Sequence, residues 1–133
     1  MTRLFLILVF LGMCCSVSAK LKVVVSDIQA GRGSVVAEIY DNDKDFFKKP
    51  LAAQTMKATN KTQDFSFEIP KGVYAVMIYQ DMNENKVLDR RMIGIPKEPY
   101  GLSNNFTPRF GPPKFDDCKF ELLQQTTLTI KLH

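Results

Sequence analysis

Histidine is almost absent from this chain of 133 residues, and tryptophan is absent altogether. The single histidine is His133, the last residue, and chain ends are usually frayed. A Ser-His-Asp or Cys-His arrangement therefore has no positioned base, and a zinc site built from histidine and cysteine lacks ligands. The sequence therefore does not predict a hydrolase with a catalytic histidine or an enzyme with a histidine-cysteine zinc site. A hydrolase that uses only carboxylates is the remaining catalytic alternative, and it would need two of Asp81, Asp89, Glu98, Asp116 and Asp117.

Long apolar runs are also lacking, since the longest one comprises the ten residues from Leu4 to Met13. This is shorter than the roughly 20 apolar residues that span a bilayer. The run follows a basic start and precedes the small residues of Val17–Ala19, a pattern typical of a secretory signal peptide. The sequence therefore predicts a signal peptide at residues 1–19 and a single exported domain at residues 20–133, with no membrane-spanning segment.

Cysteine is scarce once this leader is removed. Two of the three cysteines lie inside the leader, so Cys118 alone remains, and a single cysteine forms no intrachain disulfide. We expect Cys118 to be a small buried residue on the same strand face as Phe120 and Leu122. As an alternative to a cleaved leader, Leu11–Cys14 resembles a lipoprotein signal, in which Cys14 would carry a lipid anchor.

The mature chain is rich in two-residue alternation of apolar and polar side chains, which is the period of a β-strand. Residues 51–59 fit either a strand or a short helical turn, and we find no helical period with caps. We therefore predict an all-β fold, an immunoglobulin-like or transthyretin-like β-sandwich of about seven strands. Tyr74 follows a Pro-Lys-Gly turn, where its hydroxyl can bond nearby backbone as a tyrosine corner, or where it is one core residue of an ordinary hairpin. The other predicted strands are Leu21–Val25, Val35–Ile39, Phe65–Ile69, Val73–Tyr79, Cys118–Leu122 and Thr126–Leu132.

The alternation stops between Asp81 and Asp117, where five of the seven prolines lie. Many apolar side chains in this segment disfavour disorder, so we expect one long, ordered, Pro-rich loop over residues 81–117 that covers the sandwich. Residues 90–114 hold five basic side chains and one acidic one. In an exported protein this charge favours surface polysaccharide, lipid headgroups or an acidic protein face over nucleic acid. The alternative is a loop whose charges serve only solubility.

A candidate cation loop opens this segment. Ca²⁺ prefers oxygen ligands, and in helix-loop-helix calcium sites they come from positions one, three, five, seven and nine. Here Lys86 replaces the usual glycine at the sixth position and Met92 replaces the acid at the twelfth, so any Ca²⁺ site would be weak. The alternative is a turn whose side chains bond their own backbone. The candidate metal ligands are Asp81, Asn83, Asn85, the carbonyl of Val87 and Asp89.

A second acidic cluster, Asp41–Asp45, follows another predicted strand. If residues 51–59 form a strand, this cluster lies at the opposite end of the sandwich from Asp81. The two groups of carboxylates would then share no site.

Four blocks of the chain resemble a known family in residues, order and spacing: Pro70–Val76, Asp81–Asp89, Ile93–Asn105 and Gly111–Asp117. They are similar to a family of exported bacterial proteins called domain of unknown function twenty-one forty-one. The resemblance implies an immunoglobulin-like or transthyretin-like sandwich, export across the inner membrane of a Gram-negative bacterium to the periplasm or beyond, and no established activity. The chain departs from the family at Lys86, where members usually carry glycine, which counts against a cation loop. The first block also resembles the carboxypeptidase regulatory-like sandwiches.

These patterns favour an exported, non-catalytic binding or accessory module with an envelope or extracellular partner. The sandwich would be the scaffold, and the long loop would carry recognition. The alternatives are a weak Ca²⁺-binding structural module of the cell envelope and the carboxylate hydrolase. A purely structural role, in which polar side chains bond the loop backbone, is the alternative for each binding residue. The candidate ligand-binding residues are Tyr100, Asn104, Asn105, Arg109 and Phe110.

Overall fold

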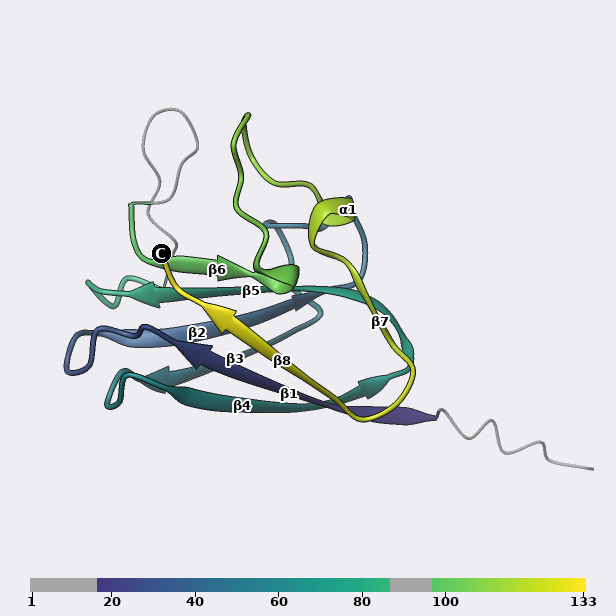
Figure 1. Cartoon of the computed structure of the whole chain (residues 1–133), viewed down its shortest axis with the longest axis horizontal. Coiled ribbons are helices and arrows are strands. Elements are labelled where there is room, and N and C mark those ends of the chain that lie inside the picture. The colour runs from purple at the N-terminus through teal and green to yellow at the C-terminus, as the bar shows by residue number, and fades with distance from the viewer. Residues whose placement is uncertain (1–16, 87–96) are drawn as a thin grey trace, which may run out of the picture.

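The computed structural model describes residues 17–86 and 97–133, and it is an all-β arrangement of two sheets (Figure 1). One sheet has three strands in the order β4-β1-β8; the other has five, the row β3-β2-β5-β6 with β7 paired to β5. The described part contains no helix long and apolar enough to cross a membrane. The elements are β1 (Ser18–Ser26), β2 (Ser34–Tyr40), β3 (Ala52–Lys57), β4 (Gln63–Pro70), β5 (Gly72–Asp81), β6 (Tyr100–Leu102), the 3₁₀ turn η1 (Ser103–Asn105), α1 (Phe115–Cys118), β7 (Phe120–Leu122) and β8 (Thr126–Lys131).

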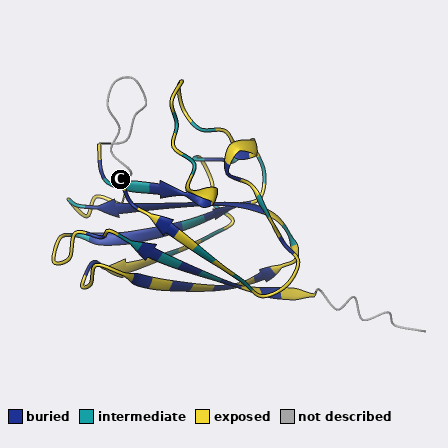
Figure 2. Cartoon of the chain, viewed as in Figure 1, coloured by how far each residue is buried: buried dark blue, intermediate teal, exposed yellow. Residues whose placement is uncertain are grey.

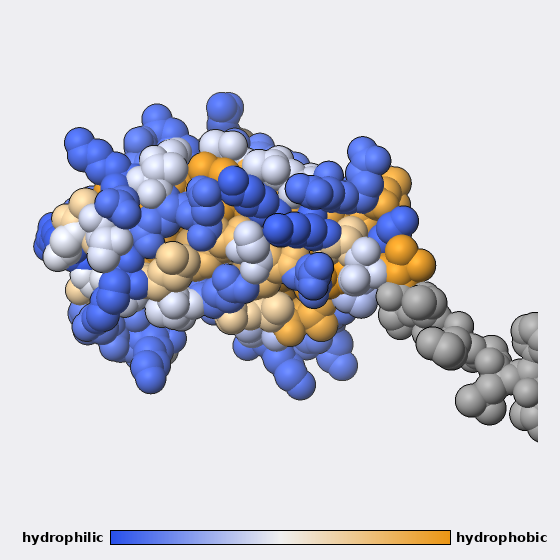
Figure 3. All heavy atoms as spheres, turned by 90° about the horizontal axis from the view of Figure 1, so that it is seen from below, coloured by the Kyte–Doolittle hydropathy of each residue, from blue (hydrophilic) through white to orange (hydrophobic). Residues whose placement is uncertain are grey.

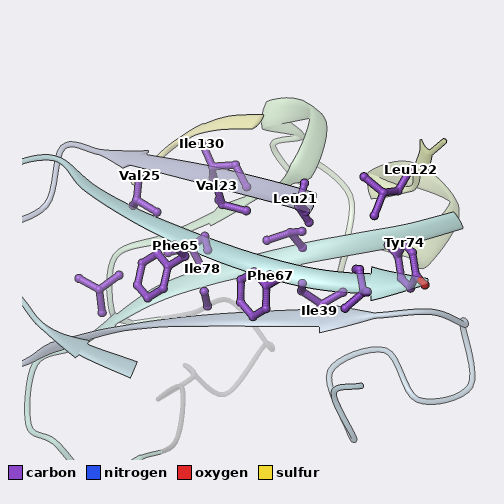
Figure 4. Close-up of a cluster of buried hydrophobic side chains, with 14 of the residues drawn as sticks. Leu21, Val23, Val25, Ile39, Phe65, Phe67, Tyr74, Ile78, Leu122 and Ile130 are labelled. Atoms are coloured by element: carbon purple, nitrogen blue, oxygen red, sulfur yellow. The ribbon is translucent and has the colours of Figure 1, made fainter. Parts of the chain in front are cut away.

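Alternate residues of the strands meet in a core between the two sheets (Figure 4). Leu21, Val23 and Val25 of β1 are fully buried there, as are Val35 and Ile39 of β2. Along β4, buried and exposed residues alternate strictly, which appears as bands in Figure 2. Successive side chains of a strand point to opposite faces, so the two-residue period of the sequence was sufficient to predict these inward positions.

A second core covers the outer face of the five-stranded sheet. β5 is buried on both faces, as its continuous apolar run predicts. The rings of Phe46, from the β2–β3 connection, and Phe115, from α1, lie 6.0 Å apart in an edge-on contact above it. The described part of the Pro-rich segment contributes β6, η1 and α1 to this cover.

The described residues form eight strands, one more than predicted. The additional strand, β6, has three residues, too few to show a period of two. A second difference concerns Cys118, which ends α1 instead of sharing a strand face with Phe120 and Leu122. It is fully buried as predicted, but in the second core, whereas Leu122 lies in the first. Burial, with a smaller effect of Asp117, raises the pKa of the Cys118 thiol to about 12, so this thiol is unreactive at neutral pH.

One side of the molecule is closed by hydrogen bonds between the two sheets. The amide of Tyr100 donates to the carbonyl of His133 at 3.3 Å, and the amide of His133 donates back at 3.0 Å. The side chain of Asn105 donates to the carbonyl of Thr129 and accepts from the amide of Lys131, at 3.0 and 3.1 Å. The chain end therefore lies beside β6 (Figure 1). The prediction that His133 is frayed is wrong for its backbone, because fraying requires unpaired amides.

Strand direction determines which loops lie at the same end of the two sheets. β2 and β5 are antiparallel with Ser34 opposite Asp81, and the ambiguous segment 51–59 contains the strand β3. The acidic cluster Asp41–Asp45 follows the far end of β2, so the predicted separation from Asp81 is confirmed.

The turn between β4 and β5 shows the predicted bond of Tyr74. Its hydroxyl donates to the carbonyl of Pro70 at 2.5 Å, while its ring is buried in the first core. Burial, with a smaller effect of Asp41, raises the pKa of Tyr74.

Candidate functional site

Four of the five predicted binding residues line one cavity, which has a volume of 620 Å³. It lies beside the loop of residues 106–114, which joins η1 to α1 and projects away from both sheets (Figure 1). These four residues are Asn104, Asn105, Arg109 and Phe110. Tyr100 does not line it: its half-buried ring packs against the second core, and burial raises its pKa.

The two asparagines have structural roles, which was the alternative interpretation of the sequence. Asn104 donates its side-chain amide to the carbonyl of Lys119 at 2.9 Å, and Asn105 binds the backbone of β8 as described above. Both residues adopt positive φ, 63° and 48°, a conformation that asparagine tolerates better than most residues. These amides hold the base of the 106–114 loop in place.

Arg109 and Phe110 have no such role. The side chain of Phe110 is 100% exposed, and Arg109 is exposed without an ion pair to any described residue. The expectation that apolar side chains of the Pro-rich segment are buried is wrong for Phe110. Its loop is nevertheless fixed at the α1 end, where the amide of Lys114 donates to the Asp117 carboxylate at 3.0 Å and Phe115 is buried.

The surface on the opposite side of the molecule has a different character. Seen from the β4 side, hydrophilic and hydrophobic side chains are interspersed over it, with apolar groups at the end near the N-terminal segment (Figure 3). The exposed side chain of Phe110 belongs instead to the 106–114 loop.

The candidate cation loop forms the turn that was its alternative interpretation. The buried carboxylate of Asp81 accepts hydrogen bonds from the amides of Asn85 and Lys86 at 3.2 and 2.7 Å. The side-chain oxygen of Asn83 also accepts from the Asn85 amide at 3.2 Å. Among the described residues there is no group of three His, Cys, Asp or Glu side chains that could hold a metal ion. The two remaining candidate ligands, Val87 and Asp89, lie outside the described residues.

The carboxylates named for a hydrolase have structural partners as well. Glu98 accepts from the amide of Met82 at 2.6 Å, and Asp116 pairs with Lys119 at 3.2 Å. Asp81 and Asp117 accept from loop amides, as described above. Asp89 lies outside the described residues.

Sequence reasoning missed a groove on the outer face of the five-stranded sheet. Its lining includes Glu38 of β2, Tyr79 of β5 and Lys57 of β3. The ammonium of Lys57 pairs with the carboxylate of Glu84, which also accepts from the Ser34 hydroxyl at 3.0 Å. The hydrogen bond from Lys57, followed by that from Ser34, lowers the pKa of Glu84. Only the register of the three strands brings these residues together, so no single segment of sequence could have indicated the groove.

The described residues thus define an all-β protein of two sheets with a projecting loop and a cavity beside it. The chain belongs to a bacterial family, domain of unknown function 2141, whose members are described as uncharacterized proteins conserved in bacteria and whose model matches residues 23–131. This confirms the family resemblance noted in the sequence. No curated protein and no solved structure matches the chain.

Proposed function

We propose that this chain is an exported, non-catalytic binding module whose 106–114 loop contacts an anionic partner in the cell envelope or outside the cell. The complete exposure of Phe110 is the observation that carries this proposal. Burying such a side chain is worth about 2 kcal/mol, and here the fold gains none of it. An aromatic ring that adds nothing to the core, on a loop fixed at its base, is available to a partner.

The surroundings of Phe110 favour an anionic ligand. Arg109 and Lys114 line the same cavity, and Arg109 has no acidic partner among the described residues. Asp117 is the acidic residue of the lining, and it already accepts a hydrogen bond from the Lys114 amide. The volume of 620 Å³ falls within the range of roughly 300–1,000 Å³ that is typical of small-ligand pockets. An acidic sugar of an envelope polysaccharide has both the charge and the size for such a site.

The rest of the proposal rests on the sequence pattern. The two sheets would form an immunoglobulin-like or transthyretin-like sandwich that serves as a scaffold. Residues 1–19 would direct export from a Gram-negative bacterium, with lipid attachment at Cys14 as the alternative. Cleavage after Ala19 would remove the first two residues of β1, which pair with Pro70 and Ile69, and would leave the remainder of the strand.

Binding to acidic envelope polysaccharide tests this proposal. We expect Phe110→Ala and Arg109→Ala each to weaken binding about tenfold, because each removes a contact worth roughly 1–2 kcal/mol. Both variants should keep the wild-type unfolding midpoint, since neither side chain supports the fold. Titration of labelled polysaccharide against the mature protein gives the affinity, and urea unfolding gives the stability.

The matched control is Leu123→Ala, which removes another exposed apolar side chain, in the connection between β7 and β8. It should bind like wild type. Unchanged affinity in both loop variants, with the fold intact, would refute the proposal. Binding to anionic vesicles but not to polysaccharide would assign the loop to lipid headgroups instead.

A second candidate function, weak Ca²⁺ binding, is favoured by one observation. The side-chain oxygens of Asp81 and Asn83 converge on the amide of Asn85, so they lie within a single turn. If Ca²⁺ binds there, it should stabilise the protein by about 1.4 kcal/mol at ten times its Kd, and the melting temperature should rise in millimolar Ca²⁺. Asp81→Ala should abolish this rise, whereas Asp43→Ala, in the acidic cluster at the other end, should retain it. A wild-type melting temperature that does not respond to Ca²⁺ would exclude the ion.

A further inference from the structure

β3 forms an open edge of the five-stranded sheet. In the row β3-β2-β5-β6, it pairs with β2 alone. At the far end of this row, backbone hydrogen bonds join Tyr100 of β6 to His133, which follows β8. The bonds that join β3 to β4 come instead from the side chains of Gln54 and Gln63, at 2.7 and 3.0 Å. Among the described residues, no strand pairs with the outer edge of β3.

Register shows which backbone groups of β3 point outward. In an antiparallel pair, every second residue exchanges backbone bonds with the residue opposite, and the residues between them direct their N–H and C=O groups the other way. The amide of Ala58 donates to the carbonyl of Gly33 at 3.1 Å, which continues the β2–β3 register by one pair. By alternation, the amides and carbonyls of Ala53 and Thr55 point away from β2. Both residues are exposed, and these four groups bond to no other described residue.

The sequence of β3 does little to block pairing with another chain. Natural edge strands are commonly protected by proline, by bulges or by inward-pointing charges. β3 has no proline, and its pairing with β2 runs without a break in register. Its one charged residue, Lys57, lies at the end of the strand and pairs with Glu84. Large apolar side chains are exposed at the edge as well, since Leu51 is 50% exposed and Met56 is 41% exposed.

A second copy of this chain matches the outward backbone groups by symmetry. A two-fold axis through Gln54 would place Ala53 of each copy opposite Thr55 of the other. These are the two residues whose amides and carbonyls point outward, so every one of the four groups in each chain would gain a partner. A closed dimer of this kind uses the same surface on both copies.

The side chains fit the same register. Met56 of each copy would lie opposite Ala52 of the other, so a large exposed side chain would meet a small one. Lys57 would lie opposite Leu51, which can cover the apolar stem of the lysine. Like charges directly opposite each other destabilise a strand pair, and none face each other here. The match is built into the chain itself, which favours a second copy over a strand from a different protein.

We infer that β3 is a dimerisation edge, at which two copies of the chain pair antiparallel about Gln54 and join their five-stranded sheets into one. A contact through one strand is at the weak end of protein interfaces, so the dimer should be reversible, with a Kd of about 10–100 µM.

Sedimentation velocity of the protein purified from its producing cells tests this inference, over a concentration series that reaches about ten times that Kd. We expect the mass to rise from that of the monomer to that of the dimer. Over the same series, hydrogen exchange at the amides of Ala53 and Thr55 should slow, because these amides gain partners only in the dimer.

Thr55→Pro is the variant that isolates the edge. Proline removes an amide that points away from β2, so the fold should be retained while dimerisation weakens at least tenfold. Glu68→Pro is the matched control on β4. Glu68 lies two residues beyond Ser66, whose carbonyl points outward to Gln54, so its amide also points away from β1. This control should dimerise like wild type, and circular dichroism checks the fold of both variants.

The position of the axis has its own test. Gln54→Lys alone and Gln54→Glu alone should each weaken the dimer, because like charges would lie opposite each other. A mixture of the two variants should form a dimer of mixed composition.

A wild-type chain that stays monomeric at the highest concentration, or a Thr55→Pro variant that dimerises like wild type, would overturn the inference. Failure of the mixed dimer would overturn the axis at Gln54. A monomer whose β3 amides respond only to an extended peptide from another protein would assign the edge to a different partner. The 106–114 loop contributes no residue to this edge, so the outcome is independent of the binding test on Phe110.

Discussion

Replacing Gly101 with alanine is expected to lower the free energy of unfolding by about 3 kcal/mol. A Cβ atom at Gly101 would lie 2.6 Å from the Cγ2 atom of Ile130 and 2.7 Å from the carbonyl oxygen of Lys131. The Ile130 side chain can move, but the Lys131 oxygen belongs to the backbone of β8. β6 would therefore have to separate from β8, which strains the bonds between Tyr100 and His133. Urea unfolding followed by circular dichroism measures the loss.

Gly72→Ala is the matched control for this substitution. Gly72 also lies in a strand, but the nearest atoms to a Cβ atom there would be the hydroxyl oxygen of Tyr74 at 3.4 Å and two of its ring carbons at 3.5 Å, which are ordinary contact distances. Its stability should lie within about 0.5 kcal/mol of wild type. If Gly101→Ala were equally stable, the close approach of β6 to β8 would not hold in solution.

Replacing Gln80 with leucine is also expected to lower the free energy of unfolding by about 3 kcal/mol. Gln80 is fully buried near the end of β5, and its amide bonds the β1–β2 connection three times. It accepts from the Gln29 amide at 2.9 Å and donates to the carbonyls of Gln29 and Arg32 at 2.8 and 2.6 Å. Leucine fills similar space but leaves these backbone groups without partners, and each unsatisfied group costs roughly 1–3 kcal/mol.

The control for Gln80→Leu is Gln54→Leu in β3. Gln54 is half-buried and its amide makes a single bond, to the carbonyl of Ser66 at 2.7 Å, so its loss should cost less than about 1 kcal/mol. Hydrogen exchange gives a second measurement, in which the amides of residues 27–33 should exchange faster in Gln80→Leu alone. Similar stabilities for the two variants would show that the β1–β2 connection does not depend on Gln80.

Most strands could be predicted from the sequence because their signal is local. The alternation in β1, β2 and β4 places Leu21, Val35 and Phe65 inward, and the structure confirms it. The bond of Tyr74 was predictable for the same reason, since Pro70 lies only four residues earlier. The single helical turn at Cys118 is also local, but four residues give no measurable period.

The candidate site was predictable only in part. Composition drew attention to Arg109 and Phe110, and the structure leaves both exposed beside one cavity. Sequence could not separate them from Asn104 and Asn105, because the partners of those asparagines lie 15 to 26 residues away on other elements. The structural role of the two asparagines depends on tertiary contacts, including those between η1 and β8.

The chain has a single histidine, and the sequence could not show whether it is fixed, because the backbone of His133 is bound by Tyr100, which lies far away in the sequence. Sequence by itself determined the all-β class and the inward faces of the strands, because both depend on a period of two. The opposite ends of Asp41 and Asp81 followed from strand parity only once residues 51–59 were found to contain β3. Tertiary structure alone decided the groove at Tyr79, the closed side at Gly101 and the buried amide of Gln80. These features depend on register between segments that are distant in sequence, and register is set by the packing of the whole core.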